Sequence, residues 1–571
     1  MEALQSSFSL GEIAPGLYGR VDTQLYKAAL ASAHNVIIDI HGGVRRRPGL
    51  TAVRIGHVQP NALDTTFIPF VFSVRDSALW NITSRGVFET VEFIENVVRT
   101  GILHNLTTGI PDNQRVSYSQ TADEVLVSSR SMQPVIIRRT LDAINRAELD
   151  DTLVEQIQDF GLPSAVASYQ QRRVLAGSNN KPASLSFSKV GEPDNFTKGT
   201  PVTENDAVGA TLVSRTIDQI IQLAQLKRMV IFTEGSEWEI NGAVTPSQVN
   251  IDRLSGWGCS DIPVVEAEDF ILFVPPDKRS IRALVTNQYD NLNSEDITLF
   301  ANHIFKNRTI RSMAHLGRLL VVVFEDGTGA LCTYDRQTQY PAWATMDTPA
   351  GRLFDVIAMP INGIWKFIFV VLPTVDATSF TLMEFDPTGA LLYDQLYQVL
   401  PTDIEAGEVD LQRLRDRQGT FSVYDIAGNL KAKSDSTASC ENFPLIPLPE
   451  EADLEGTHYI GMPFPAYIET LNVQEEVGAG PLMGRRVTIP RARVQVLNTR
   501  GLRMGPPGKL TSVRDRQFEG PGEQTKLFSG YIRQSLNTDW TQNGRLRIEA
   551  SDAQPMHILS IIPDLDTGGQ D

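Results

Sequence analysis

Three consecutive arginines, Arg45, Arg46 and Arg47, are the residues of this chain whose type and spacing best suit a binding role. They stand between Gly-Gly and Pro-Gly in the run 41–49, and these neighbours favour a turn that presents the side chains. A guanidinium group pairs with carboxylates and phosphates through two parallel hydrogen bonds. The alternatives are a carboxylate of an adjacent subunit, DNA phosphate or plain exposure to solvent, and we expect the first.

A second group of arginines lies near the end of the chain. Its members are Arg485, Arg486, Arg491, Arg493, Arg500 and Arg503. The chain as a whole carries a formal charge of −17, so this group stands out as a basic patch. A basic face of one protomer that meets an acidic face of the next suits ring assembly. We therefore predict that Arg491 and Arg493 lie at an interface with an adaptor or a neighbouring subunit.

An apolar segment broken by glycine and proline precedes the arginine triplet. Phe8, Leu17 and Tyr18 favour burial, whereas the glycines and Pro15 around them prevent a long helix. We expect these three side chains to be held against a subunit or an adaptor rather than against the chain's own core. Disorder of the segment is the alternative.

The sequence contains none of the familiar motifs of catalysis. The sequence holds no phosphate-binding Gly-x-x-x-x-Gly-Lys loop, no Gly-x-Ser-x-Gly elbow and no His-Glu-x-x-His. The eight histidines are dispersed, and the three cysteines are too scattered for a disulfide framework or a zinc site. The carboxylate pairs 150–151 and 450–451 could serve a glycosidase only if a cleft brought distant members together. We expect no catalytic residue, no cofactor and no metal.

The length and net charge of the chain limit the classes of protein to which it can belong. The 571 residues are 42% apolar, which is enough for two to four domains with real cores. The net charge argues against a protein that grips nucleic acid over most of its surface, but it suits the wall of a channel through which DNA slides. Residues 1–19 lack the pattern of a signal peptide, and the longest apolar run, 367–372, is far too short to span a bilayer. We expect a chain made in the cytosol and not inserted into a membrane.

Short strands with turns between them predict a mainly β fold. The run 318–334 reads as a hairpin, and similar hairpins are centred near residues 85, 131, 180, 235, 277 and 376. Spacing of roughly 40 to 50 residues is typical of propeller blades, although any β-rich chain shows a hairpin every few dozen residues. We predict a propeller-like central domain of repeated β-hairpins, additional antiparallel β domains and little helix.

The expected organisation has four parts. They are an N-terminal docking or inter-subunit segment (1–60), a β-propeller-like domain (61–395), a small β domain with a proline-rich acidic linker (396–456) and a C-terminal antiparallel β domain (457–571). Alternation in 491–497 and 545–550 predicts half-buried strands in the last part. The best helix candidates are 23–35, with Asp22 as its N-cap, and 141–158.

The N-terminal run resembles a known family. Residues 8–22, Phe-Ser-Leu-Gly-Glu-Ile-Ala-Pro-Gly-Leu-Tyr-Gly-Arg-Val-Asp, and the turn Gly-Gly-Val-Arg-Arg-Arg-Pro-Gly at 42–49 are similar to the start of tail nozzle proteins, also called tail tubular protein B, of short-tailed bacteriophages. Further segments similar to that family lie at 118–127, 162–177, 233–238, 258–261, 459–464 and 500–505. Leu175 departs from it, because family members often carry phenylalanine there.

The resemblance implies a structural role in the virion. Such a subunit would assemble into a homo-hexameric tube under a tail adaptor ring, carry tail fibres or spikes, and let double-stranded DNA pass through its lumen without specific binding. Loops would narrow the channel until contact with the host opens it. Two other classes remain open: a propeller that recognises host surface glycans as a receptor-binding protein, and an enzyme that degrades surface polysaccharide.

Overall fold

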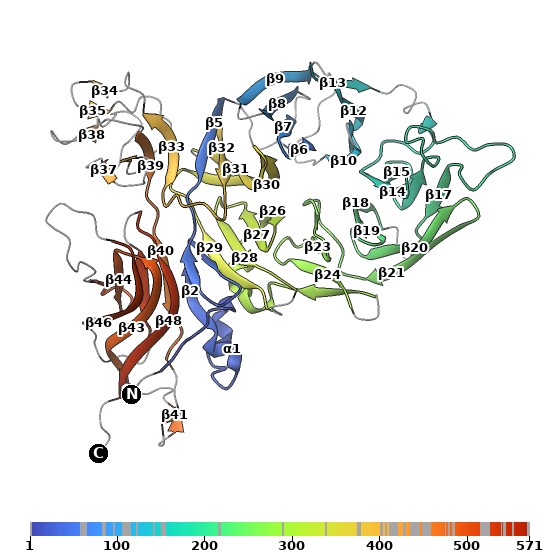
Figure 1. Cartoon of the computed structure of the whole chain (residues 1–571). Coiled ribbons are helices and arrows are strands. Elements are labelled where there is room, and N and C mark those ends of the chain that lie inside the picture. The colour runs from blue at the N-terminus through green and yellow to red at the C-terminus, as the bar shows by residue number, and fades with distance from the viewer. Residues whose placement is uncertain are drawn as a thin grey trace.

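Short antiparallel strands form a ring of sheets beside a second group of sheets in the computed structural model (Figure 1). Colours in Figure 1 follow the chain, and they run round the ring in sequence order. The structure describes residues 3–57, 66–82, 87–94, 97–105, 116–121, 124–140, 143–149, 156–214, 218–287, 291–336, 340–373, 379–399, 404–405, 408–409, 421–425, 430–433, 446–447, 458–473, 476–477, 480–481, 486–513, 526–537, 540, 544–550 and 553–567.

Five separate sheets of four antiparallel strands follow one another along the chain and form blades one to five. Blade one holds β6 Thr66–Ser73, β7 Asp76–Ile82, β8 Val87–Ile94 and β9 Val97–Asn105. Blade two holds β10 Ser117–Thr121, β11 Glu124–Ser129, β12 Met132–Thr140 and β13 Ala143–Leu149. Blade three holds β14 Ala165–Tyr169, β15 Arg172–Ala176, β16 Ser184–Phe187 and β17 Val208–Thr211. Blade four holds β18 Ile220–Gln225, β19 Met229–Thr233, β20 Glu237–Thr245 and β21 Gln248–Ser255. Blade five holds β22 Val265–Glu266, β23 Phe270–Phe273, β24 Arg282–Thr286 and β25 Leu292–Asp296.

Two further blades belong to larger sheets. Blade six holds β26 Ile310–Leu316, β27 Leu319–Phe324, β28 Gly329–Thr333 and β29 Ala342–Met346. Blade seven holds β30 Arg352–Ile361, β31 Ile364–Leu372 and β32 Ser379–Phe385, and β5 Thr51–His57 pairs with β32 as its fourth strand. The expected hairpins all lie between the second and third strands of a blade. The propeller-like fold is therefore confirmed, and the described residues form seven blades.

Apolar and polar contacts join the blades. Trp80 of blade one and Val125 of blade two share one buried cluster, and the rings of Phe232 and Phe273 meet 5.2 Å apart between blades four and five. Among the residues that the structure describes, no backbone ladder links one blade to the next, and polar side chains join the innermost strands. Gln120 on β10 illustrates this: it accepts from the N–H of residue 71 on β6 (3.1 Å) and donates to the same residue's carbonyl (2.7 Å). Ser77 on β7 donates to a carbonyl of β30 (2.5 Å), which ties blade one to blade seven.

Residues 3–57, which we call the N-terminal strap, supply strands to three sheets. Its elements are β1 Gly11–Glu12, η1 Pro15–Leu17, α1 Gln24–Lys27, β2 Ala29–His34, β3 Val36–Ile38, β4 Val44–Arg46 and β5. β1 and β2 extend blade six toward the C-terminal strands, whereas β3 and β4 join a sheet of five strands. The segment predicted as a separate docking arm thus ties the propeller to the rest of the chain.

The C-terminal part of the chain, from β40 on, forms a sandwich of two sheets over a shared core. Its strands are β40 Ala466–Thr470, β43 Thr488–Thr499, β44 Leu502–Gly505, β45 Thr511–Ser512, β46 Phe528–Ser535, β47 Arg547–Ala550 and β48 His557–Asp566. One sheet continues from β2 through β40, β47, β44 and β45, and the other has the order β3-β4-β48-β43-β46. Alternation in β43 buries Ala492, Val494 and Val496 and leaves the intervening residues on the outer face. The half-buried strands expected here are confirmed.

Smaller elements complete the description. Blade seven continues from β5 through β33 Asp394–Val399, β39 His458–Met462, β36 Ser422–Asp425 and β37 Leu430–Lys433. Short pairings are made by β34 Ile404–Glu405, β35 Glu408–Val409 and β38 Ile446–Pro447, and by β41 Glu476–Val477 and β42 Gly480–Pro481. One helical turn, η3 Leu299–Ala301 followed by α3 Asn302–Phe305, precedes blade six.

Both helix predictions were wrong. Within 23–35 only α1 is helical, and its N-cap position is Thr23 rather than Asp22. The apolar residues after it form β2, which is paired on both sides by β1 and β40 and is almost wholly buried. Residues 143–149 of the second candidate form the strand β13. Ladder pairing outweighs local helix propensity at both places, and in β2 burial adds to it.

Candidate functional site

The arginine triplet lies at the junction between the strap, the propeller and the sandwich rather than on an exposed turn. Arg45 is half-buried and its Nε is 3.1 Å from Oδ1 of Asp39, whereas Arg46 and Arg47 are buried. Arg46 donates to the carbonyls of Phe464 (2.6 Å) and Gln554 (3.1 Å) in the C-terminal region. The β4 strand therefore presents its arginines to the chain itself.

Arg47 and Asp394 form an ion pair with no solvent exposure on either side chain. Arg47 Nη1 lies 3.1 Å from Asp394 Oδ1, and Nη2 lies 3.3 Å from Oδ2. Asp394 also accepts from the hydroxyl of Thr348 (2.6 Å) and from the N–H of Leu50 (2.8 Å). A buried ion pair is stable only when the other hydrogen-bonding positions of both groups also have partners. We call this group of contacts the arginine junction.

Two further contacts complete the arginine junction. The guanidinium of Arg47 lies 3.6 Å from the ring centre of Phe464, close enough for a cation–π contact. Its Nε donates to Oδ1 of Asn35 (2.9 Å), and a terminal nitrogen donates to the carbonyl of Asp347 after β29 (2.8 Å). One side chain thus holds the strap, blade six and the C-terminal region together.

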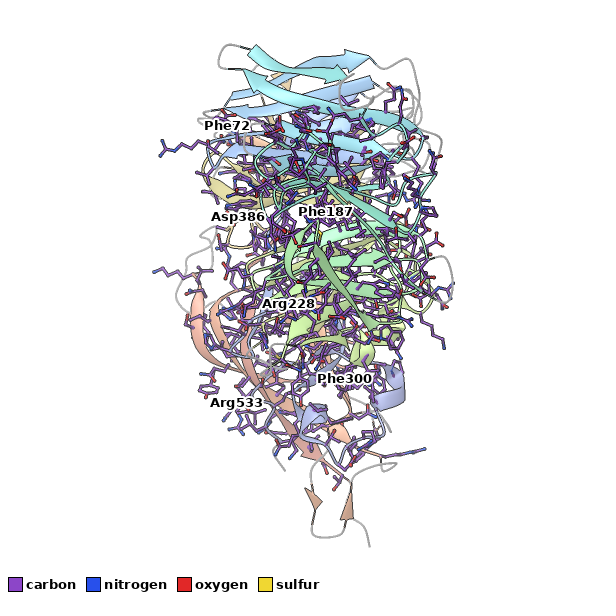
Figure 2. All side chains as sticks on the ribbon, turned by 90° about the vertical axis from the view of Figure 1, so that its right-hand side faces the viewer. Phe72, Phe187, Arg228, Phe300, Asp386 and Arg533 are labelled. Carbon is purple, nitrogen blue, oxygen red and sulfur yellow. The ribbon has the colours of Figure 1, made fainter. Side chains whose placement is uncertain are left out.

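These contacts correct part of the expected interface. The idea that the strap is held against something other than the chain's own core is wrong for Phe8, which has no exposed surface and packs in the sandwich core. Arg46 and Arg47 have intrachain partners and are 3% and 0% exposed, so neither has the surface needed to reach another subunit. Leu17 and Tyr18 are half-buried beside Leu10 and Ile13, and Figure 2 shows Phe300 in the same region beside the strap.

The interface role stays a prediction for the residues that keep exposed surface. Arg491 is exposed and Arg493 is half-buried, 3.6 Å from Asp564. Both lie on the outer face of the five-stranded sheet, where Arg493 is directly opposite Arg533 of β46. Figure 2 shows Arg533 on this sheet, away from the propeller, and Tyr531 on the same strand is 60% exposed. Arg485 of the same predicted group lies outside the described residues.

A polar cavity on the propeller axis is the second candidate site, and the sequence did not indicate it. Its volume is about 670 Å³, and its walls are the innermost strands β10, β14 and β18 with the loop that leads into β22. We call it the axial cavity. Blades two to five thus enclose a space that a ligand of moderate size could enter.

Two groups in the axial cavity have displaced pKa values. Burial, with the charges of Asp355 and Glu266, raises the pKa of Tyr118 to about 12. Burial also raises the pKa of Glu266, although a hydrogen bond from the Gln225 N–H partly opposes it. At the rim, burial lowers the pKa of Arg130, against the effect of the Glu234 charge. Glu266 is nevertheless exposed to solvent, so the cavity is open to water on that side.

The remaining thiols and acidic side chains of the described residues offer little further chemistry. Cys259 and Cys332 are buried free thiols whose pKa values burial raises, which disfavours the reactive thiolate. Among the described residues no three His, Cys, Asp or Glu side chains converge on a metal position, and no helix there is long and apolar enough to cross a membrane. The carboxylate pairs 150–151 and 450–451 lie outside the described residues.

The fold and these sites define the class as a seven-bladed β-propeller joined by its N-terminal strap to a β-sandwich. No family model and no curated protein matches the chain. Similar solved structures include the WD40 repeats of RRP9 (10% identity, 58% of this chain and 100% of that one, TM-score 0.38) and YCF48 bound to D1 peptide (10%, 60% and 99%, TM-score 0.36). The β-propeller domain of Cps50 (Swd1) from Myceliophteria thermophila is another (8%, 60% and 100%, TM-score 0.36). The propeller assignment rests on the strand order of this chain and not on these distant likenesses.

Proposed function

We propose that this chain is a structural subunit of a short bacteriophage tail, a nozzle that assembles into a ring below the adaptor and forms the channel for DNA ejection. Its role is mechanical and involves neither catalysis nor a cofactor. Fibres or spikes would attach to its outer surface, and DNA would pass through the lumen of the ring. The mature subunit would reside in the virion after synthesis in the bacterial cytoplasm.

One observation carries the proposal: the residues of the N-terminal resemblance are those that build the strap. Phe8 is in the sandwich core, and buried Glu12 accepts from the Ala33 N–H (2.8 Å) and contacts Nε2 of His303 (2.8 Å). Gly49 passes so near Tyr393 that an added Cβ would lie 1.8 Å from that residue's carbonyl oxygen. A similarity made of residues with such specific packing supports a shared architecture. It therefore supports a shared role better than matches at surface positions would.

Continuous sheets also suit a subunit that must resist mechanical force. Sheets of ten and of eight strands run without a break from the propeller into strands supplied by the strap and by the C-terminal region. Backbone hydrogen bonds in series resist separation of the parts, whereas a flexible linker would let them move independently. Such a subunit can transmit force through a tail without relative motion of its parts.

Oligomer mass tests the proposal directly. Native mass spectrometry of the purified chain, alone and with the adaptor protein, is expected to show a six-membered ring of about 380 kDa from the 63.1 kDa subunit. Class averages from electron microscopy are expected to show sixfold symmetry. Stable monomers under all conditions, even with the adaptor, would contradict the proposal.

The charge of the lumen is a second test. Because DNA must slide without sticking, the wall of the assembled channel is expected to be acidic, in keeping with the net charge of −17. A structure of the ring in which lysine and arginine line the lumen would contradict this part of the proposal, whatever the symmetry of the ring.

A receptor-binding propeller that recognises host glycans is the second candidate, and the axial cavity favours it. The cavity is polar and large enough for a sugar residue. Tight binding of the monomer to a glycan array, without ring formation, would support this candidate over the nozzle. Ring formation without glycan binding would support the nozzle.

A further inference from the structure

Trp257 is the most exposed of the six tryptophans, with 54% of its surface accessible to solvent. It lies in the turn that leads from β21 of blade four to β22 of blade five. Trp80, Trp238 and Trp343 are buried, as a large apolar side chain usually is. The groups around Trp257 show that its exposed position is fixed by the structure.

A buried cation covers the inner face of the Trp257 ring. The guanidinium carbon of Arg282 lies 3.7 Å from the ring centre, and Arg282 itself is only 8% exposed. Its Nε donates to the hydroxyl of Ser294 on β25 (2.7 Å), and its Nη2 donates to the carbonyl of the same residue (3.1 Å). The guanidinium is therefore held in place, and the indole that stacks on it has one face covered. Because about half of the indole remains accessible, its opposite face meets solvent.

The backbone of the turn is fixed as well. Glu237 on β20 has no exposed surface, and its Oε2 accepts from the Ser255 hydroxyl and from the N–H of Trp257 (3.3 Å). Gly258 follows with a φ of +77°, and a Cβ there would lie 2.1 Å from the carbonyl oxygen of Glu234. The chain is thus anchored at Trp257 and directly after it. A ring that is held in one orientation loses little freedom when a ligand binds to it.

Hydrogen-bond donors lie beside the exposed ring. Neither the indole N–H of Trp257 nor the guanidinium of Arg253 has a hydrogen-bond partner among the described residues. Arg253 is exposed, and its Nη2 would lie 3.0 Å from a Cβ at Gly256, the residue before Trp257. The turn therefore combines an open aromatic face with two groups that can donate hydrogen bonds to a ligand.

We propose that Trp257 is a stacking platform for a sugar ring, with the indole N–H and Arg253 donating hydrogen bonds to oxygens of that sugar. A pyranose presents C–H groups on its face, which pack on an aromatic ring, and oxygens on its edge, which accept hydrogen bonds. A cationic ligand fits less well, because Arg282 already lies under the ring. Nucleic acid also fits less well, because Asp252 on β21 and Glu234 on the adjoining turn are exposed carboxylates that repel phosphate.

This inference goes beyond the mechanical role proposed above. It gives the chain a glycan site that is separate from the axial cavity, since Trp257 is not among the residues that line the cavity. A nozzle and a receptor-binding propeller could both carry such a site. Sugar binding and ring formation are therefore independent outcomes, and either can fail without the other.

Saturation-transfer NMR of the full chain with maltotriose, chitotriose and 3′-sialyllactose tests the inference. At least one of these trisaccharides is expected to bind with a dissociation constant of about 1 mM or below, because a single sugar ring makes few contacts. Trp257→Ala removes the platform and is expected to weaken that affinity about tenfold or more. Trp257→Phe keeps an aromatic ring but removes the N–H, so the expected loss is about threefold. Thermal melting of each variant confirms that it is folded.

The matched control is Trp365→Ala. Trp365 on β31 of blade seven is 46% exposed, so this substitution removes a similarly exposed indole elsewhere, and the affinity is expected to change by less than about twofold. Equal weakening by both alanine substitutions would reveal nonspecific contact with exposed tryptophans and overturn the proposal. Failure of all the trisaccharides to bind would overturn it too. Binding of single-stranded oligothymidine that Trp257→Ala abolishes, in place of sugar binding, would assign the platform to nucleobases and overturn the sugar class.

Discussion

The arginine junction and the axial cavity are both polar, but the junction is buried and its charged groups have partners in the chain, whereas the cavity is open to solvent at Glu266. At the junction, the Asp394 carboxylate accepts from Arg47, Thr348 and Leu50, so both of its oxygens are used. In the cavity, Glu266 has one oxygen in use and Tyr118 has none of its hydrogen-bonding capacity in use among the described residues. The Asp394 carboxylate thus has all its partners in the chain, whereas the Glu266 carboxylate does not.

The difference separates a structural cluster from a candidate binding site. A buried charge whose partners come from the chain contributes to stability and has no capacity left for a ligand. An acceptor that faces water has no partner in the chain, so a ligand can take the place of that water. The arginine triplet, which looked like the binding element, is the structural cluster, and the site with free capacity lies elsewhere.

The largest expected effect comes from Arg47→Ala. Removing the guanidinium leaves the Asp394 carboxylate buried beside only neutral donors, so we expect the free energy of unfolding to fall by about 3–5 kcal/mol. Urea denaturation followed by tryptophan fluorescence measures it. Arg45→Ala breaks only the half-exposed pair with Asp39 and is expected to cost less than about 1 kcal/mol. Similar losses of stability for both variants would contradict the different roles assigned to Arg45 and Arg47.

Gly49→Ala tests how closely the strap must pass the propeller. An added Cβ would lie 1.8 Å from the carbonyl oxygen of Tyr393, which is backbone and cannot rotate away. Overpacking of this kind is expected to cost about 1–3 kcal/mol in the same denaturation experiment. Gly16→Ala is the control, because nothing lies within 4 Å of a Cβ at Gly16. A neutral Gly49→Ala would show that the strap can move aside.

The junction is expected to lose stability in acid. Burial alone would raise the pKa of Asp347, but hydrogen bonds from His34 and Asn35 and the charges of His34 and Arg47 hold that pKa below its ordinary value of 3.8. A depressed pKa in the folded state contributes stability above the unfolded value, and this is lost as the pH falls below 3.8 through the folded value. Asp347→Asn is therefore expected to be less stable at pH 7 by roughly 1 kcal/mol. The two stability curves are expected to converge in acid, and a constant gap at all pH values would refute this.

The cavity is expected to respond to pH with the opposite sign. Burial raises the pKa of Glu266, so folding favours its protonated form, and that contribution disappears as the pH rises through the folded pKa. Glu266→Gln is expected to raise the melting temperature slightly at neutral pH and to leave it unchanged in acid. A drop in melting temperature at neutral pH would mean that Glu266 is structural, like Asp394.

The smallest effect on stability is expected for Arg491→Glu, on the exposed face of the sandwich. A surface change of this kind should alter the free energy of unfolding by less than about 0.5 kcal/mol. If the interface prediction is right, ring formation measured by native mass spectrometry falls sharply. Normal ring formation by this variant would show that Arg491 does not contribute to the interface. Arg46 and Arg47 cannot serve for this test, because their substitution also breaks buried hydrogen bonds within the chain.

The positions of the blades could be predicted because they depend on short-range signals. Turn residues, alternation and regular spacing are local properties of the chain, and the hairpin expected at 318–334 is β27 and β28. The segment 23–35 shows where prediction from local signals fails. Its apolar residues read equally well as a buried helix or a strand, and only pairing with β1 and β40 decided for the strand.

The sequence by itself determined a seven-hairpin β chain, an acidic surface and an N-terminal run of unusual composition. Only the tertiary structure decided what the charged residues contact. Arg47 and Asp394 are 347 positions apart, and the axial cavity is assembled from four blades. A turn forms from neighbours along the chain, whereas the partner of a charged group is set by how distant strands pack, and no local pattern encodes that choice.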